Sequence, residues 1–581
     1  MSDAVSSPPN APTPPARPAE PDAPRTVRRA ALLLALLVLV VLAGRVLGPS
    51  DLHQNTDQSK TIAATADVVI NGAWALPRDL VGEGLKKPPL LNWVGAPVVA
   101  LFGWSELPLK APAVLFGLTA AASALLAARL LLPRLATTPD RPTIAPPVGS
   151  GPRGVRDRRD ALAAAAAPSL AIAAAALWIA SPSGVKNIYF LRPDIALAAA
   201  LSVGWLAAVF TLDRPARTRR ERLGFTLPAL AIWLAAAAAV LAKGPVALLV
   251  PIYAMLHALL LPLRDPADAP ASDRPSARLR AKLSRLQKAG WWWGLPLMLA
   301  IGLAWLAAAH RADPVFVRDT LLAGEVLDRV HKGTGGVEIL RIIRACFTVP
   351  GFFVERFALG GALWIFAIVF VIPPRRWRTH PLAPAVLWTL LITVTMILFA
   401  GRAGSYTAPA YPAAAVLAVY ALARVFAPLT SRALQGHTGL RGDAFAALAL
   451  IAALAALAQP LLLSRGAETR LGDRIKHFAR HAAQTVGDET VAFLWTGHNP
   501  VPVLMGRHRT GNPTTDQLAA AQWLVLPLSK APDGASPALT SEPLTRLSGD
   551  GVHAEFEGLA LYHKDDIDPA RIPQGEDTGI D

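Results

Sequence analysis

The sequence predicts an all-α polytopic membrane protein with about eleven transmembrane helices, further helices lying on its outer face, and a small soluble α/β domain at its C-terminal end. Hydrophobic residues make up 53% of the 581 residues and charged residues only 17%, which is too apolar for a soluble enzyme of this length. Apolar runs close to the ~20 residues that cross a bilayer recur along the chain. Arginine clusters separate many of these runs, as cytoplasmic retention of positive charge produces.

The N-terminal segment differs from the rest of the chain. It is rich in proline and nearly devoid of large apolar side chains, so we expect residues 1–29 to be a disordered cytoplasmic tail. Arg25, Arg28 and Arg29 precede the apolar run AALLLALLVLVVLAGRVLG. That run is longer than the apolar part of a signal peptide and has no convincing cleavage site, so it predicts an uncleaved anchor with the N-terminus inside.

Residues 30–464 form the predicted transmembrane domain. Its apolar runs predict spans at 30–48, 110–133, 161–180, 194–212, 225–242, 245–263, 290–309, 351–372, 381–400, 407–427 and 444–463. When the spans alternate in direction, every arginine-rich loop falls on the cytoplasmic side. These loops contain Arg153 to Arg159, Arg214 to Arg220, Arg274 to Lys288, and Arg375 with its neighbours.

Two long connections, residues 49–109 and 310–350, then lie on the outer, periplasmic side. The stretch IAATADVVI after Asp57 and the stretch LLNWVGAPVVALFG after Pro89 are each too short to span a bilayer. We expect both to form helices that lie along the outer membrane face.

Residues 465–581 have a different character. DETVAFLWTG and QWLVLPL predict short strands, and TRLGDRIKHFARHAAQTVG predicts an amphipathic helix. We expect a periplasmic accessory α/β domain without a nucleotide fingerprint or a metal-spaced His/Cys set.

Composition excludes some functions. The net charge of +16 comes from loop arginines with no interleaved aromatic patch, which argues against nucleic acid. Cys346 is the single cysteine, so no intramolecular disulfide can form, and its apolar setting predicts a packed thiol.

Charged residues expected on the outer side gather where loops meet helices. They are Asp57, Lys86, Lys87, Arg192, Asp194, Lys243, Glu325, His331 and Arg402. A carboxylate beside an acceptor hydroxyl can remove its proton, while lysine and arginine can bind a phosphate and stabilise the charge that develops as it leaves. This mixture suits transfer of a group from a lipid phosphate.

Each of these residues also has a structural interpretation. Asp57 can cap the helix that follows it, Lys87 can extend to the lipid headgroups, and the Arg192–Asp194 sequence RPD can be a local ion pair at the start of a span. Lys243 lies in a tight outer turn, LAKGPVALLVP, where a basic residue is disfavoured, so a functional role explains it better.

Three motifs in the first outer loop carry a resemblance. Asp57-Gln58, Gly72-Ala73-Trp74 and Lys86-Lys87-Pro88 follow one another at the separations found in the GT-C class of lipid-phosphate-sugar-dependent glycosyltransferases. The chain resembles the lipid A aminoarabinose transferase family and its protein O-mannosyltransferase relatives. Further matches follow in order over roughly residues 30–425: RPD, LAKGPVALLVP, EVLDRVHKG and RAGSYTAPAYPA.

The resemblance implies a GT-C-like fold and a role for each matched residue. It places catalytic acids at Asp57 and Asp194, with Asp57 as general base, and donor-phosphate or substrate contacts at Lys87, Lys243, Arg402, Tyr406, Arg192 and Glu325.

Two positions depart from the family pattern. Gln58 replaces an acid, and Lys86 stands where relatives carry a glutamate that resembles a metal ligand. A cation cannot coordinate a metal, so Lys86 argues against carrying over the relatives' metal site, and His331 can be a polar loop residue.

The sequence thus predicts a bacterial inner-membrane glycosyltransferase that moves a sugar, with inversion, from a polyprenyl-phosphate donor to a periplasmic acceptor. The acceptor is lipid A, a protein or another glycan, and no nucleotide is required. A glycolipid transporter or flippase is the main alternative, although it predicts internal repeats and mid-membrane charges that the sequence does not show. A membrane scaffold, with dispensable outer-loop charges, is the third.

Overall fold

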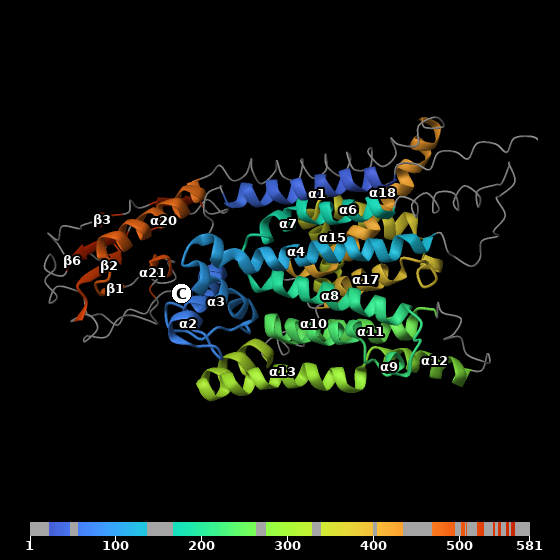
Figure 1. Cartoon of the computed structure of the whole chain (residues 1–581), viewed down its shortest axis with the longest axis horizontal. Coiled ribbons are helices and arrows are strands. Elements are labelled where there is room, and N and C mark those ends of the chain that lie inside the picture. The colour runs from blue at the N-terminus through green and yellow to red at the C-terminus, as the bar shows by residue number, and fades with distance from the viewer. Residues whose placement is uncertain are drawn as a thin grey trace, which may run out of the picture.

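The computed structural model describes residues 23–46, 56–135, 167–262, 275–327, 339–372, 374–398, 404–433, 467–493, 501–505, 507, 520–527, 539–540, 544–547, 553–556 and 559–563. Most of these residues are helical, and the long helices run side by side in one bundle (Figure 1).

The bundle consists of α1 (Ala23–Val46), α4 (Glu106–Leu131), α6 (Ala167–Ala180), α8 (Pro193–Asp213), α10 (Leu227–Lys243), α11 (Leu249–Leu260), α13 (Trp291–Ala312), α15 (Ile339–Phe357), α16 (Leu359–Phe366), α17 (Ala383–Leu398) and α18 (Tyr411–Ala433). Short 3₁₀ segments are η1 (Leu132–Leu135), η2 (Gly244–Leu248), η6 (Pro374–Arg376) and η7 (Gly404–Ala410), and π-helical ones are η4 (Phe316–Leu327) and η5 (Ala367–Val371). One end of the bundle carries α2 (Thr56–Asn71) and α3 (Leu90–Phe102), and α7 (Pro182–Asn187) lies toward that end; the other end carries α9 (Arg219–Arg222) and α12 (Pro275–Lys288) (Figure 1).

Five helical segments are long and apolar enough to cross a membrane: Glu106–Leu135, Pro193–Asp213, Arg219–Leu260, Trp291–Ala312 and Tyr406–Val425. Shorter apolar helices cover Ala31–Val46, Leu90–Phe102, Ala167–Ala180, Leu359–Val371 and Ala383–Leu398. The described helices therefore agree with a polytopic, mostly helical protein. The total of about eleven spans stays a prediction, and the run 444–463 lies outside the described residues.

One expected span is not a continuous helix. The sequence predicts a single helix over 351–372, but α15 ends at Phe357 and α16 begins at Leu359. Ala358 between them has φ +46°, which a residue with a Cβ rarely adopts. Gly361 then passes so close to Phe353 that an added Cβ would lie 2.0 Å from its carbonyl oxygen. Apolar composition cannot reveal this break, because both helices are apolar.

The prediction of a packed Cys346 thiol is wrong, because the side chain is exposed. In helix α15, Ala345, Val349 and Phe353 are buried, whereas Cys346 and Phe347 are exposed. An apolar stretch thus placed the cysteine beside buried residues in sequence but not in space.

The two helices expected within residues 49–109 are present as α2 and α3, and their place on the outer membrane face stays a prediction. They pack on each other, and α3 packs on α4. Asn92 donates to the carbonyl oxygen of Thr61 at 2.8 Å and to Thr65 Oγ1 at 3.0 Å, so a buried amide ties α3 to α2. Gly95 allows the close approach, since an added Cβ would lie 3.2 Å from Thr65 Cγ2.

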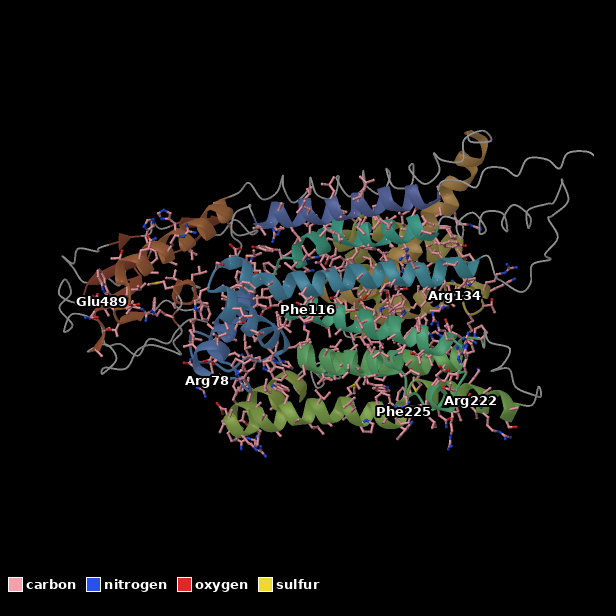
Figure 2. The ribbon with its side chains drawn as sticks, viewed as in Figure 1. Arg78, Phe116, Arg134, Arg222, Phe225 and Glu489 are labelled. Atoms are coloured by element: carbon pink, nitrogen blue, oxygen red, sulfur yellow. The ribbon has the colours of Figure 1, made fainter. Side chains whose placement is uncertain are left out.

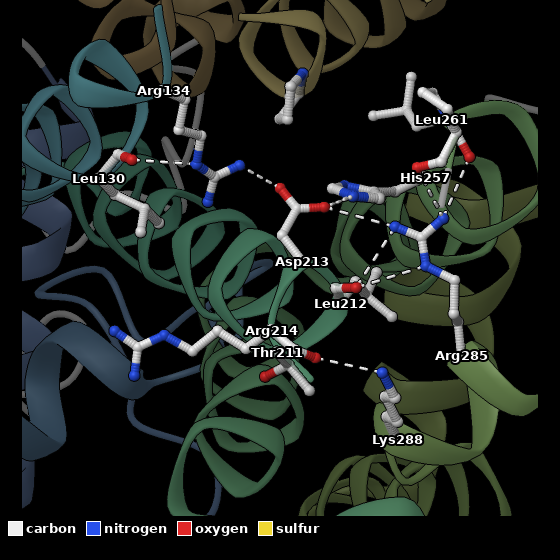
Figure 3. A network of polar contacts seen from close by, with 12 residues as sticks. Leu130, Arg134, Thr211, Leu212, Asp213, Arg214, His257, Leu261, Arg285 and Lys288 are labelled. Atoms are coloured by element: carbon white, nitrogen blue, oxygen red, sulfur yellow. Dashed lines mark hydrogen bonds and ion pairs between the residues drawn. The ribbon is translucent and has the colours of Figure 1, made fainter. Parts of the chain in front are cut away.

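Buried charges join the helices at the other end of the bundle (Figure 3). Asp213, at the end of α8, receives a close contact from Arg134 and lies 2.8 Å from His257 Nε2 and 3.4 Å from Arg285 Nη2. Arg285 also donates to the carbonyl oxygens of Leu212 and Leu261. These carbonyl groups lie at the C-terminal ends of α8 and α11, where they have no partner within the helix. A cationic helix, α12, thereby caps two spans.

Charged side chains lie at both ends of the bundle (Figure 2). Arg134 and Arg222 lie at the α12 end, whereas Arg78 lies at the α2 end and Glu489 in the C-terminal elements beyond it (Figure 2). Between the two ends, most of the side chains are apolar, such as that of Phe116 (Figure 2). This distribution is that of a chain crossing an apolar layer.

The C-terminal elements form a small helix-and-sheet unit. They are α20 (Ala467–Val486), α21 (Val501–Leu504), β1 (Val491–Phe493), β2 (Trp523–Pro527), β3 (Leu539–Thr540), β4 (Leu544–Leu547), β5 (His553–Phe556) and β6 (Leu559–His563). One sheet has the order β1-β2-β6-β3, with β1 parallel to β2 and the other pairs antiparallel, and β4 pairs with β5. Strands β1 and β2 and helix α20 fall in the stretches where the sequence predicts them; an independent domain over 465–581 stays a prediction.

Helix α21 links this unit to the bundle. Val503 is fully buried and belongs to the core of the bundle, and Leu504 packs against both cores. Helix α21 contacts α2, the helix that begins with Asp57.

We predict that Asp213→Asn destabilises the fold, because the substitution leaves buried arginines facing a neutral group. The expected loss is about 3–5 kcal/mol. Thermal unfolding in detergent, followed by intrinsic fluorescence, measures it. The matched control is Asp319→Asn, which breaks an exposed ion pair with Arg318 and should change stability by about 0–1 kcal/mol. Equal melting temperatures for the two variants contradict the prediction.

Candidate functional site

Five charged side chains of alternating sign form a continuous series at the α2 end of the bundle. In order of contact they are Lys87, Asp57, Arg192, Asp194 and Lys243. They come from four segments that are distant in sequence and meet only in the fold. We refer to these five residues as the charge series.

Local helix structure places the members of the charge series. Asp57 lies in the first turn of α2, and Asp194 in the first turn of α8, after Pro193 at the start of that helix. Lys243 occupies the last turn of α10 and is followed by the capping residue Gly244, with φ +66°. The N-terminal end of a helix dipole is positive and its C-terminal end is negative, so acids at helix starts and a cation at a helix end are stabilised.

Asp57 is held by two cations. Its Oδ1 accepts from Lys87 Nζ at 2.9 Å, and its Oδ2 accepts from Arg192 Nη2 at 2.9 Å. Burial favours the neutral acid, but Lys87 and Arg192 outweigh that effect and hold the pKa of Asp57 below its usual value. The carboxylate is therefore charged at neutral pH, and both of its oxygens are engaged.

The other half of the charge series is more deeply buried. The Asp194 side chain is 5% exposed, receives Arg192 Nη2 at 3.3 Å, and makes a close hydrogen bond with Lys243. The Lys243 ammonium lies 3.9 Å from the ring centroid of Tyr406 in η7, a cation–π contact. Arg192 Nε is buried and has no hydrogen-bond partner among the described residues. This donor is suited to an anionic ligand.

Gln58 sets the position of Arg192. It is fully buried, and its Oε1 accepts from the backbone N–H of Leu191 at 3.0 Å. Because Leu191 directly precedes Arg192, this bond fixes the α8 segment against α2. From the sequence, Gln58 stood out only as a neutral residue in the place of an acid; a contact across 133 positions leaves no local signal.

Two acids that the sequence did not single out organise the loop between α2 and α3. Asp67 accepts from the backbone N–H of Arg78 and from Asn71 Nδ2, each at 2.7 Å. Asp79, 1% exposed, pairs with Lys60 at 3.3 Å. These bonds fold the loop back on α2 before the chain reaches Lys87.

Another buried group of charges lies nearby and also went unpredicted. Lys110 is fully buried in α4, where it pairs with Glu106 at 3.1 Å and lies 4.5 Å from the ring centroid of Tyr189. Arg45 of α1 lies 5.8 Å from the same centroid. The sequence predicts a span that begins at residue 110, whereas α4 begins at Glu106. Lys110 therefore lies inside the helix rather than at its start.

Other predicted site residues are placed as follows. The structure brings Asp57, Lys87, Arg192, Asp194, Lys243 and Tyr406 together. Glu325 belongs to η4, Lys86 is exposed, and Arg402 and His331 lie outside the described residues. Within the described ranges, no group of three or more His, Cys, Asp or Glu side chains could hold a metal ion.

The arrangement of helices is that of a known membrane enzyme, ArnT, with which the chain shares its fold. ArnT from Cupriavidus metallidurans, a lipid A aminoarabinose transferase, bound to undecaprenyl phosphate, superposes with a TM-score of 0.54 at 17% identity, over 94% of this chain and 100% of that chain. Its apo state gives 0.53 at 16% identity, over 94% and 99%.

A more distant structure is the Archaeoglobus fulgidus oligosaccharyltransferase AglB with an inhibitory peptide and a dolichol-phosphate, at a TM-score of 0.46 and 13% identity over 91% of this chain and 74% of that one. No family profile and no curated protein matches the sequence. The similarity to ArnT thus confirms the expected GT-C-like fold.

We predict that Gln58→Leu destabilises the protein, because the buried N–H of Leu191 loses its acceptor. The cost of one unsatisfied buried donor is about 1–3 kcal/mol. Thermal unfolding in detergent measures it, with Gln287→Leu as the same change at an exposed position. Equal melting temperatures for the two variants would show that the hydrogen bond between Gln58 and Leu191 does not stabilise the protein.

Proposed function

We propose that the protein is a membrane glycosyltransferase that moves a sugar from a polyprenyl-phosphate donor to an acceptor hydroxyl on the outer face. The charge series carries this proposal. It puts one accessible carboxylate beside two cations, with a third cation behind them, which are the groups that the reaction needs. The fold shared with ArnT, whose structure contains undecaprenyl phosphate, supports the same donor class.

Asp57 is the general base. Its carboxylate removes the proton from the acceptor hydroxyl while the hydroxyl oxygen attacks the anomeric carbon of the sugar. The bond between that carbon and the phosphate oxygen breaks, and its electron pair leaves with the polyprenyl phosphate. A single displacement of this kind inverts the anomeric configuration. Its energy comes from the lipid-phosphate bond, so the proposed reaction uses no nucleotide.

Cations receive the leaving phosphate. Lys87 and Arg192 are 31% and 24% exposed and border Asp57, so a phosphate that contacts them lies beside the base. Arg192 Nε is a donor without a partner among the described residues. Lys243 adds positive charge from behind, and Arg402 is proposed to join them. Charge-assisted hydrogen bonds of this type stabilise the additional negative charge on the departing phosphate.

Asp194 has a supporting role in this scheme. It is nearly buried and is paired with both Arg192 and Lys243, so it orients the two cations, whereas Asp57 is the more exposed acid. The proposed location is the bacterial inner membrane, with the N-terminus inside and the site facing the periplasm. The proposed acceptors are lipid A, a protein or another glycan.

Asp57→Asn is predicted to slow sugar transfer about 10²–10⁴-fold, the usual contribution of a general base. The measurement is the rate at which membranes containing the protein release polyprenyl phosphate from lipid-linked sugars. Asp319→Asn, an exposed substitution of the same type, should keep the parent rate. Undiminished transfer by Asp57→Asn rules out this base.

Lys87→Met is predicted to weaken binding of undecaprenyl phosphate about 10–100-fold, because one charge-assisted contact is worth roughly 1.5–3 kcal/mol. Equilibrium binding to purified protein in nanodiscs tests this. The neighbouring Lys86→Met is the matched control, because Lys86 is exposed and this substitution removes the same charge from the same loop. Equal weakening by both variants indicates general attraction by the loop and contradicts a specific contact.

A further inference from the structure

We propose that the phosphate of the lipid donor displaces Asp57 from Lys87 and Arg192, so that donor binding converts Asp57 into an effective base before the acceptor reacts. This inference rests on the proposed function. It addresses a difficulty in the resting site: both carboxylate oxygens of Asp57 already accept from a cation, at 2.9 Å each. A carboxylate held in this way is a poor proton acceptor.

The charge series is built to exchange ions at one end only. Asp57, Lys87 and Arg192 keep 36%, 31% and 24% of their side chains exposed. The opposite pair, Asp194 and Lys243, keeps 5% and 11%. An incoming anion therefore meets the Asp57 end first, while the buried pair stays closed.

Charge balance favours the exchange. Three cations and two carboxylates give the charge series a net charge of +1. A sugar linked through one phosphate brings a single negative charge, which matches this excess. The phosphate competes with Asp57 for Lys87, and Arg192 can turn toward it while remaining anchored to Asp194 at 3.3 Å.

Helix α2 carries one cation of its own, Lys60. This lysine is engaged by Asp79 and Glu83 at 3.3 and 3.4 Å. The segment before α3 contributes Lys87, and the segment before α8 contributes Arg192, with Asp194 behind it. Once the two cations turn to the phosphate, Asp57 loses the two positive charges that lower its pKa and lies close to the negative charge of the phosphate, so its pKa rises.

The same exchange also explains how the cycle closes. Transfer leaves the acceptor proton on Asp57 and converts the phosphate from a diester into a monoester, which carries more negative charge and binds the cations more tightly. Neutral Asp57 does not compete for them. When Asp57 releases its proton to water, it regains Lys87 and Arg192 and helps to expel the polyprenyl phosphate.

The test measures ionisation of Asp57 directly, with undecaprenyl phosphate as a sugar-free probe. Infrared difference spectra of the full-length protein in nanodiscs are titrated with pH, and the spectra of Asp57→Asn are subtracted. The carboxylate midpoint should rise by about one pH unit or more when the lipid phosphate is bound. Undecaprenol, which has the same tail without the phosphate, should leave it unchanged. An unchanged or lowered midpoint with bound undecaprenyl phosphate overturns the inference.

Two neighbouring variants make the test specific. In lipid-free protein, Lys87→Met should raise the Asp57 midpoint, and adding the lipid phosphate should then move it less than in the parent protein. Lys86→Met should behave as the parent does in both states. If the two variants shift the midpoint equally, the pairing with Lys87 is not what holds Asp57.

The outcomes separate this inference from the proposed function. Native mass spectrometry of the same samples reports whether undecaprenyl phosphate is bound. Failure to bind overturns the proposed donor class and this inference together. Binding without a rise in the midpoint overturns the displacement of Asp57 alone and leaves the proposed transfer reaction standing.

Discussion

The pairing of Asp57 with Lys87 and Arg192 is the interaction on which the α2 end of the bundle depends. A carboxylate partly removed from water needs opposite charge or hydrogen bonds around it. Here the two partners come from two other segments of the chain, so satisfying Asp57 also joins α2, the loop before α3 and the start of α8. Arg192 then extends the same pairing to Asp194 and Lys243, which brings in α10. The contacts that join these segments are therefore also the ones that the proposed reaction would use.

A second network stabilises the opposite end of the bundle, around Asp213. Its cations come largely from α12 and pair with carbonyl groups at the ends of α8 and α11, where an apolar helix leaves them without partners. Helix α8 thus carries an acid at each end, Asp194 and Asp213, and both are ion-paired and nearly buried. With its two ends fixed, α8 is a rigid support for Arg192.

Much of this arrangement could be predicted from the sequence. The apolar runs and arginine loops indicate a polytopic chain, and six of the eight proposed site residues do meet in space. Acids at helix starts and lysines in apolar turns, such as Asp57 and Lys243, are visible locally, which is why the sequence could single them out; their roles stay predictions. The ordered motifs around them pointed to the GT-C-like fold.

Other features had no local signal. The bond from Leu191 to Gln58 and the burial of Lys110 depend on contacts between distant segments. The break at Ala358 depends on a backbone conformation that composition does not encode. Cys346 shows the related limit, because an apolar neighbourhood in sequence became an exposed face in the helix.

The central claim is that this chain transfers a sugar from a polyprenyl phosphate through Asp57. The most direct measurement is mass spectrometry of envelope glycolipids and glycoproteins from cells that produce the parent protein or Asp57→Asn at equal levels. The account predicts a glycan mass that is present only with the parent protein, and accumulation of the lipid-phosphate sugar with the variant. Identical glycan profiles in the two strains would contradict it.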